Sequence, residues 1–117
     1  MNQPTLSTNV RKPQSNVGII DIQGDVTGFA ENTLMDAFSQ ASNGSTKTIL
    51  LNFSGLDYMN SSGIGLLVTL LIRTQRQKQR LIAYGLSEHY QEIFKLTRLN
   101  EAIGIYGDET EALAAIN

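Results

Sequence analysis

Apolar and polar residues follow two different periods along the chain, and the change of period marks the expected strands and helices. The alternation in LSTNV (residues 6–10) predicts a short edge strand. The run VGIIDIQ (residues 17–23) predicts a second strand, which a turn at Gly24-Asp25 ends. From residue 30 the apolar positions fall at helical spacing, which predicts a helix with an inward face of Ala30, Leu34, Ala37, Phe38 and Ala41.

The middle of the chain predicts another strand and another helix. Residues 42–45 (SNGS) end the first helix, and we expect Gly44 to take a left-handed conformation there. The run TKTILLNF (residues 46–53) is apolar at its centre, as expected for an interior strand covered on both faces. A polar loop is predicted over residues 54–60. The helix after it is apolar over residues 64–72 and ends in RTQRQKQR, whose cations we interpret as a solvated helix end stabilised by the helix dipole.

Four shorter elements are predicted in the last third of the chain. Residues 81–84 (LIAY) and 103–106 (IGIY) have the composition of short strands. Ser87 suits the N-cap of a helix over residues 88–97. Residues 108–116 begin with an Asp and a Glu three positions apart, which predicts a capped C-terminal helix. The inward residues expected of the helix that follows Ser87 are Ile93, Phe94 and Leu96.

The predicted order is β, β, α, β, α, β, α, β, α. Strands that alternate with helices imply βαβ crossovers, so we expect an α/β fold with a small mixed, mainly parallel sheet and about four helices packed on it. Residues 1–16 are expected to form an N-terminal segment with the edge strand, and residues 17–117 the single domain. Residues 54–62 would then follow the carboxyl end of the third strand, where ligands and partners bind in open α/β sheets.

The composition excludes several classes of function. The chain has 117 residues, no cysteine, one histidine and a formal net charge of -2. Disulfide and thiolate chemistry are therefore excluded, and one histidine leaves little material for a His-rich metal site or a Ser-His-Asp triad. A negative net charge does not suit a dedicated nucleic-acid binder, and no apolar run approaches the ~20 residues of a membrane-spanning helix. We expect a cytoplasmic protein with no cofactor, no metal, and no direct contact with nucleic acid or membrane.

The stretch LDYMNSSGIGLLVTLL (residues 56–71) contains the candidate chemistry. Ser61 and Ser62 stand where a helix begins, directly before the most apolar segment. The glycines of residues 63–65 open a helix after a strand, but a valine replaces the third glycine of a GxGxxG loop and no GK[ST] follows. A nucleophilic serine also needs an adjacent base, and nothing places His89 beside these serines. Enzymatic activity is therefore not expected.

Two interpretations of the serine pair remain open from the residues alone. Ser-Ser before a helix is most often a cap and nothing more. A phosphoserine, in contrast, carries roughly -1.5 to -2 charges, and a helix N-terminus accommodates that charge without unfolding. If the surface around Ser61 binds a partner, the added charge would oppose binding and leave the fold intact.

The same stretch resembles the STAS domains, specifically the SpoIIAA-like anti-sigma factor antagonists. The segment LDYMNSSGIGLLV is similar to the family pattern of an apolar strand followed by L-x-x-[FY]-[IM]-D-S-[ST]-G-[LI]-G. The segment GDVTGFAEN after the second strand and the spacing of the last strand and helix support the likeness, which covers roughly residues 17–116. The resemblance implies the fold derived above.

The resemblance also implies a function, which is partner switching. In this family the unmodified antagonist binds an anti-sigma factor that is also a serine kinase, and the sigma factor is released. The kinase phosphorylates the serine after the motif aspartate, which breaks the complex, and a PP2C-type phosphatase reverses the modification. By position the acceptor is Ser61, with Ser62 as second choice. The implied partner surface comprises Asp25, Thr27, Asp57, Tyr58, Met59, Asn60, Ser61, Ser62, Gly63 and Ile64.

Two positions depart from the family pattern. Asn60 replaces the motif aspartate, which removes a charge beside the acceptor but keeps a capping side chain. Thr27 occupies the place of a frequent aspartate in the first loop. The family also includes scaffold proteins and domains attached to transporters. The alternative function is therefore a STAS scaffold or binding module that is not phosphorylated.

Overall fold

A computed structural model describes residues 5–116 of the chain and confirms the expected order of elements. The predicted N-terminal segment (residues 1–16) and the predicted domain (residues 17–117) include residues 1–4 and 117, which lie outside the described residues. The five strands are β1 (Leu6–Gln14), β2 (Val17–Val26), β3 (Thr48–Met59), β4 (Arg80–Tyr84) and β5 (Gly104–Tyr106). The helices are α1 (Glu31–Ala41), α2 (Ser61–Arg76), α3 (Glu88–Leu96) and α4 (Glu109–Ile116), with the 3-10 turns η1 (Gly28–Ala30) and η2 (Leu99–Glu101).

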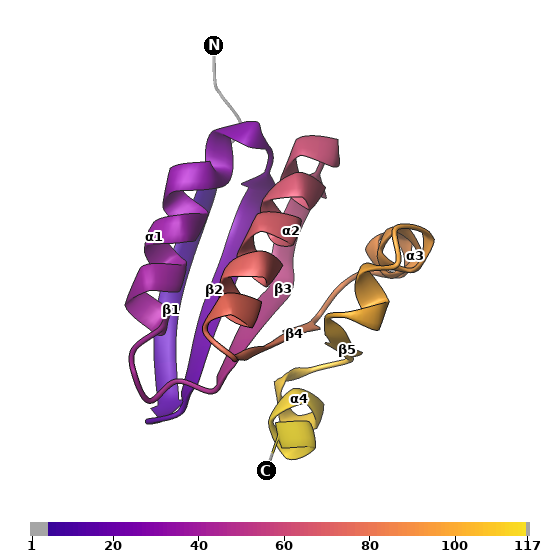
Figure 1. Cartoon of the computed structure of the whole chain (residues 1–117). Helices are drawn as coiled ribbons and strands as arrows, with labels where there is room; N and C mark the ends of the chain where they lie inside the picture. Colours follow the sequence, from indigo (N-terminus) through magenta and orange to yellow (C-terminus); the bar gives the residue numbers. More distant parts are fainter. Residues whose placement is uncertain (1–4, 117) are drawn as a thin grey trace.

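The strands form one sheet in the order β1-β2-β3-β4-β5 (Figure 1). β1 and β2 form an antiparallel hairpin, and every later pair is parallel. A mixed, mainly parallel sheet is thus confirmed. Because β2, β3 and β4 run in the same direction, their carboxyl ends meet at one edge of the sheet, which we call the carboxyl edge.

The helices cover the two faces of the sheet unequally. α1, α2 and α3 contribute to the larger apolar core on one face, whereas α4 packs on the smaller core of the other face. The interior strand β3 serves both, since Leu51 faces the larger core and Leu50 the smaller one. In the larger core, the rings of Phe53 and Phe94 meet edge to face with centroids 6.2 Å apart.

The prediction of a loop over residues 54–60 is wrong for most of its length, because β3 continues as a strand to Met59. β2 also continues past its predicted end, so the two strands keep pairing, with Val26 opposite Met59. The pairing shifts register twice along this extension, and β2 passes through Gly24 with φ +104°. Polar residues and glycine predicted loops in both segments. The backbone hydrogen bonds between β2 and β3 nevertheless hold the two segments extended.

Two smaller predictions are also wrong. Gly44 does not take a left-handed conformation; α1 ends at an extended Ser42, whose N–H donates to the carbonyl oxygen of Phe38 at 2.9 Å. Leu96 is 75% exposed, not inward. α3 buries Tyr90 and Phe94, which are four residues apart, and two further residues rotate the helix by about 200°, away from the core.

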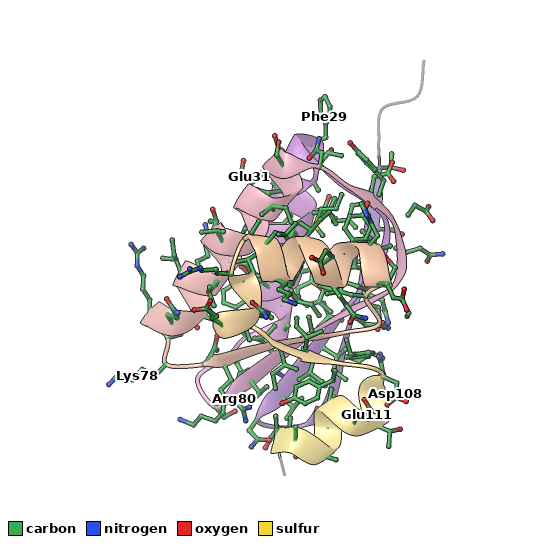
Figure 2. All side chains as sticks on the ribbon, turned by 90° about the vertical axis from the view of Figure 1, so that its right-hand side faces the viewer. Phe29, Glu31, Lys78, Arg80, Asp108 and Glu111 are labelled. Carbon is green, nitrogen blue, oxygen red and sulfur yellow. The ribbon has the colours of Figure 1, made fainter. Side chains whose placement is uncertain are left out.

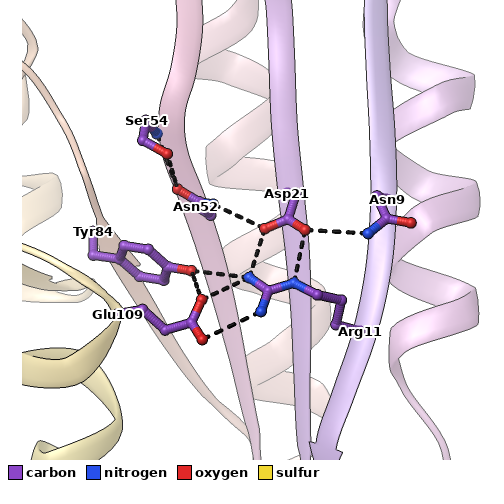
Figure 3. Close-up of polar contacts among 7 residues, drawn as sticks. All are labelled: Asn9, Arg11, Asp21, Asn52, Ser54, Tyr84 and Glu109. Atoms are coloured by element: carbon purple, nitrogen blue, oxygen red, sulfur yellow. Dashed lines mark hydrogen bonds and ion pairs between the residues drawn. The ribbon is translucent and has the colours of Figure 1, made fainter.

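A polar network joins α4 to strands β1 to β4 (Figure 3). Arg11 on β1 donates two hydrogen bonds of 2.8 Å to the carboxylate of Asp21 and two, of 2.6 and 3.2 Å, to that of Glu109. The hydroxyl of Tyr84 donates to Glu109 at 2.6 Å, and the amide of Asn52 donates to Asp21 at 2.8 Å. The Arg11 guanidinium holds the pKa of Asp21 at about 2 and lowers the pKa of Glu109.

The network predicts an acid-sensitive part of the stability. Both carboxylates have pKa values lowered in the folded state, so they stabilise the fold above pH ~4 and lose this contribution as the pH falls towards 2. Replacing Arg11 with methionine should therefore remove about 1 kcal/mol of the fall in stability between pH 5 and 2.5, a figure reduced for solvent screening. Urea unfolding at both pH values measures this. Arg98→Met, which breaks only an exposed 3.8 Å pair with Glu101, should keep the wild-type profile; a wild-type profile for Arg11→Met would contradict the prediction.

Candidate functional site

The carboxyl edge brings together two segments that the sequence singled out. The extended ends of β2 and β3 pair Asp25 with Tyr58 and Val26 with Met59. Beyond the strands, the N–H of Asn60 donates to the carbonyl oxygen of Val26 at 3.3 Å. The loop after β2 therefore lies beside the start of α2. All ten residues of the implied partner surface come from these two neighbouring segments.

The start of α2 is capped by Asn60 rather than by a serine. Its side-chain oxygen accepts the N–H of Gly63 at 2.9 Å. Ser61 and Ser62 are the first two helical residues, and both are exposed. Their own N–H groups have no protein acceptor within the described part of the chain. The serine hydroxyls are therefore free of a capping role, and two helix-terminal donors stand beside them.

Gly63 sets how closely α2 approaches the sheet. A Cβ atom at this position would overlap the carbonyl oxygen of Val26 and lie 2.9 Å from the Cγ of Met59. Gly63 itself is buried. Only glycine therefore allows the first turn of α2 to rest on the end of β2, with Ser61 and Ser62 turned outward.

Tyr90 ties α3 to the same edge. Its hydroxyl accepts the N–H of Met59 at 2.9 Å, and this hydrogen bond is buried. Met59 is the last residue of β3, directly before the cap of α2. The position of the serine pair therefore depends on a side chain that lies 29 residues further along the chain than Ser61.

Replacing Tyr90 with phenylalanine tests this link. The buried N–H of Met59 would lose its acceptor, which should cost about 2 kcal/mol of the free energy of unfolding. Urea denaturation of the variant measures the loss. Tyr106→Phe is the control, because no hydrogen bond of the Tyr106 hydroxyl occurs among the described residues. Equal stability of the two variants would show that the bond contributes nothing.

The described residues offer no arrangement for a metal. Within residues 5–116, no group of three or more His, Cys, Asp or Glu side chains could hold a metal ion. His89 is exposed on α3, where its ring meets that of Tyr90 with centroids 4.8 Å apart. Within the same residues, no helix is long and apolar enough to cross a membrane.

Comparison with known proteins identifies the family. The model of the STAS domain matches residues 9–112, which is most of the chain. This chain belongs to the STAS-domain family.

Solved structures share the fold of this STAS domain. Bacillus SpoIIAA in its phosphorylated form is 22% identical over 95% of this chain and 100% of its own, with a TM-score of 0.73. An anti-sigma factor antagonist from Mycobacterium paratuberculosis is 16% identical, over 95% of this chain and 93% of its own, with a TM-score of 0.79. A sulfate transporter family protein from Wolinella succinogenes is 17% identical, over 90% and 88%, with a TM-score of 0.77. At these identities the likeness shows the fold alone.

The residues of the implied partner surface differ in exposure. Asp57, Tyr58, Ser61 and Ser62 are exposed, and Asp25, Asn60 and Ile64 are half-buried. The other three residues, Thr27, Met59 and Gly63, are buried. Four side chains of this STAS domain are therefore exposed to a partner, and the three buried residues lie beneath them.

Sequence reasoning missed Phe29, which is 68% exposed in η1 (Figure 2). The hydroxyl of Thr27 accepts the N–H of Phe29 at 3.3 Å, which fixes the turn that projects the ring outward. A Cβ atom on Gly28 would lie 3.6 Å from the Cβ of Ser62, so the turn lies against the start of α2. Phe29 and Tyr58 are the two aromatic side chains more than half exposed among the described residues. The available signal was a phenylalanine between Gly28 and Ala30 in a polar loop.

Proposed function

We propose that this STAS domain is an anti-sigma factor antagonist that acts by partner switching. In its unmodified form it binds an anti-sigma factor that is also a serine kinase, through the carboxyl edge. Phosphorylation of Ser61 breaks this complex, and a PP2C-type phosphatase restores it. The domain acts as a binding module and catalyses no reaction. The observation that carries the proposal is the exposed Ser61 at the first turn of α2, with a capping bond that it does not itself provide.

The local chemistry supports a modification that spares the fold. The Asn60 cap uses only the N–H of Gly63, so the donors of Ser61 and Ser62 can bind phosphate oxygens. The positive end of the α2 dipole also favours the added charge. A partner that covers the exposed rings of Phe29 and Tyr58 would also bury this charge. Its burial in the interface would require the charge to lose its water, which is unfavourable. A phosphate at this position therefore opposes binding and leaves the domain folded.

Mass spectrometry of the protein isolated from its own cells tests the proposal. We expect one phosphate on wild type, located on Ser61, and none on Ser61→Ala. A phosphate on Ser62 would move the assignment by one residue. If neither serine is modified under any growth condition, the alternative function holds, which is a constitutive STAS scaffold. The fold shared with a sulfate transporter family protein makes that alternative concrete.

Phe29 should be a main anchor of the partner complex. Exposed aromatic side chains at the centre of interfaces often contribute 2 kcal/mol or more, so Phe29→Ser should weaken binding about 30-fold. Its melting temperature should remain that of wild type, because the ring is 68% exposed. Isothermal titration with the anti-sigma factor measures the affinity. Leu96→Ser, which changes a 75% exposed side chain at the end of α3, is the control and should bind normally.

A further inference from the structure

The charges of this chain are unevenly distributed. Six of its nine Lys and Arg residues lie at the end of the sheet opposite the carboxyl edge. We call this set the basic edge: Lys12, Lys47, Arg73, Arg76, Lys78 and Arg80, all exposed. The N–H of Arg80 donates to the carbonyl oxygen of Lys47 at 2.8 Å, and Lys78 and Arg80 project at the end away from Phe29 (Figure 2).

The cations of the basic edge are not neutralised by the domain itself. Within residues 5–116, none of the six has a carboxylate oxygen within 4.0 Å. The ion pairs of these residues involve Arg11 and Arg98, which lie elsewhere. Like charges gathered without counter-charges repel one another and destabilise the folded state. The protein keeps this arrangement although its net charge is negative.

Helix ends explain only part of the basic edge. Arg73 and Arg76 lie in the last turn of α2, where cations interact favourably with the helix dipole. Lys12 donates to the carbonyl oxygen of Ala41 at the end of α1, at 2.8 Å. Lys47 precedes β3 and Arg80 begins β4, so no helix end accounts for these two.

Lys78 is held in an unfavourable conformation. Its φ is +59°, in the left-handed region, directly after the residue that caps the end of α2. The N–H of Gln79 donates to Thr74 at 2.9 Å and the N–H of Lys78 to Gln75 at 3.0 Å, a helix ending that usually has glycine at this position. A lysine here costs stability relative to glycine, as does Arg98, whose φ is +62°.

An apolar stripe on α2 leads into the basic edge. Val68 and Ile72 are 39% and 43% exposed, and Arg76 follows Ile72 by four residues on the same helix face. Exposed aliphatic side chains beside cations suit the boundary between lipid headgroups and acyl chains. They suit nucleic acid less, because bases stack on aromatic rings and the exposed rings of this domain, Phe29 and Tyr58, lie at the carboxyl edge.

We propose that the basic edge binds the surface of an anionic lipid bilayer. The cations attract the anionic headgroups, and Ile72 contacts the upper acyl chains. Asp108 precedes α4 and Glu111 lies in its first turn; both lie at the same end of the molecule as Lys78 and Arg80 but on its other side (Figure 2). The α2 side of this end therefore faces the membrane in our proposal. The contact is peripheral and leaves Ser61 facing away from the membrane. It departs from the expectation of no membrane contact, and it does not depend on the proposed function.

Vesicle sedimentation tests the proposal. The protein should bind phosphatidylcholine vesicles that contain about one-third phosphatidylglycerol, and not pure phosphatidylcholine vesicles. The double variant Lys78→Gln/Arg80→Gln should bind about 30-fold more weakly, since each cation near an anionic surface contributes about fivefold. The control Lys95→Gln/Arg98→Gln has the same net charge but changes cations outside the basic edge, and it should bind within about twofold of wild type.

Three results would overturn the proposal. These are absence of binding to the anionic vesicles at low salt, an equal loss in both double variants, and tighter binding to duplex DNA than to the vesicles. Lys78→Gly gives a second measurement. Because glycine adopts the left-handed conformation freely, this variant should melt about 3 °C higher while binding the vesicles more weakly. A variant that is more stable and binds the vesicles as well as wild type would show that Lys78 has no part in binding.

Discussion

Replacing Gly63 with alanine should destabilise the domain by about 3 kcal/mol, the largest loss we expect from adding one methyl group. The new Cβ atom would overlap the carbonyl oxygen of Val26, which belongs to the backbone of β2 and cannot rotate away. α2 would have to move away from the sheet, and Ser61 and Ser62 would move with it. Urea denaturation measures the loss of stability.

Gly65 provides a matched control two residues further along α2. A Cβ atom there meets no atom within 4 Å, so Gly65→Ala should gain about 1 kcal/mol from helix propensity alone. The two variants make the same chemical change in one helix and should move stability in opposite directions. If both stabilise the domain, α2 does not rest on β2 as closely as described.

Replacing Ser61 with aspartate should weaken binding of the anti-sigma factor about 100-fold, because a charge at this position must lose water to enter the interface. The phosphorylated protein should lose at least as much affinity, since it carries more charge. The melting temperature should stay that of wild type, because Asn60 and not Ser61 accepts the capping bond. Titration calorimetry and thermal unfolding measure the two quantities.

The controls for Ser61 separate charge from damage. Ser61→Ala should bind as tightly as wild type, since it removes neither the cap nor an apolar anchor. Ser39→Asp adds the same charge to an exposed position on α1 and should also bind normally. Full affinity of Ser61→Asp would identify the domain as a constitutive binding module instead.

The sequence predicted the elements whose signal is local. The helical spacing before Ala41 and the capping residue Ser87 placed two helices correctly, because caps and apolar stripes depend on nearby residues. The extension of β3 to Met59 could not be read in this way. It depends on pairing with β2, more than 30 residues earlier, and β-structure in polar segments follows its neighbours more than its own composition.

The candidate site shows the same division. Asn60, Ser61 and Ser62 stand at a helix start, as their residue types suggest, and the sequence could not say which of the three would cap. Phe29 stood between two small residues in a polar loop, but the sequence could not show that η1 leaves its ring 68% exposed. The bond from Met59 to Tyr90 depends on how α3 packs on the sheet. The assignment of Ser61 as phosphate acceptor stays a prediction.

The Arg11 network also bears on how the domain completes its folding during synthesis. Arg11 lies on the first strand, and its partner Glu109 follows 98 residues later. The face of the sheet that α4 covers includes Ile19, Leu50 and Ile82, which stay uncovered until α4 has left the ribosome. The nascent chain therefore exposes an apolar surface until α4 packs on it. A chaperone that binds such surfaces would meet this domain late, in the seconds before Arg11 and Glu109 pair.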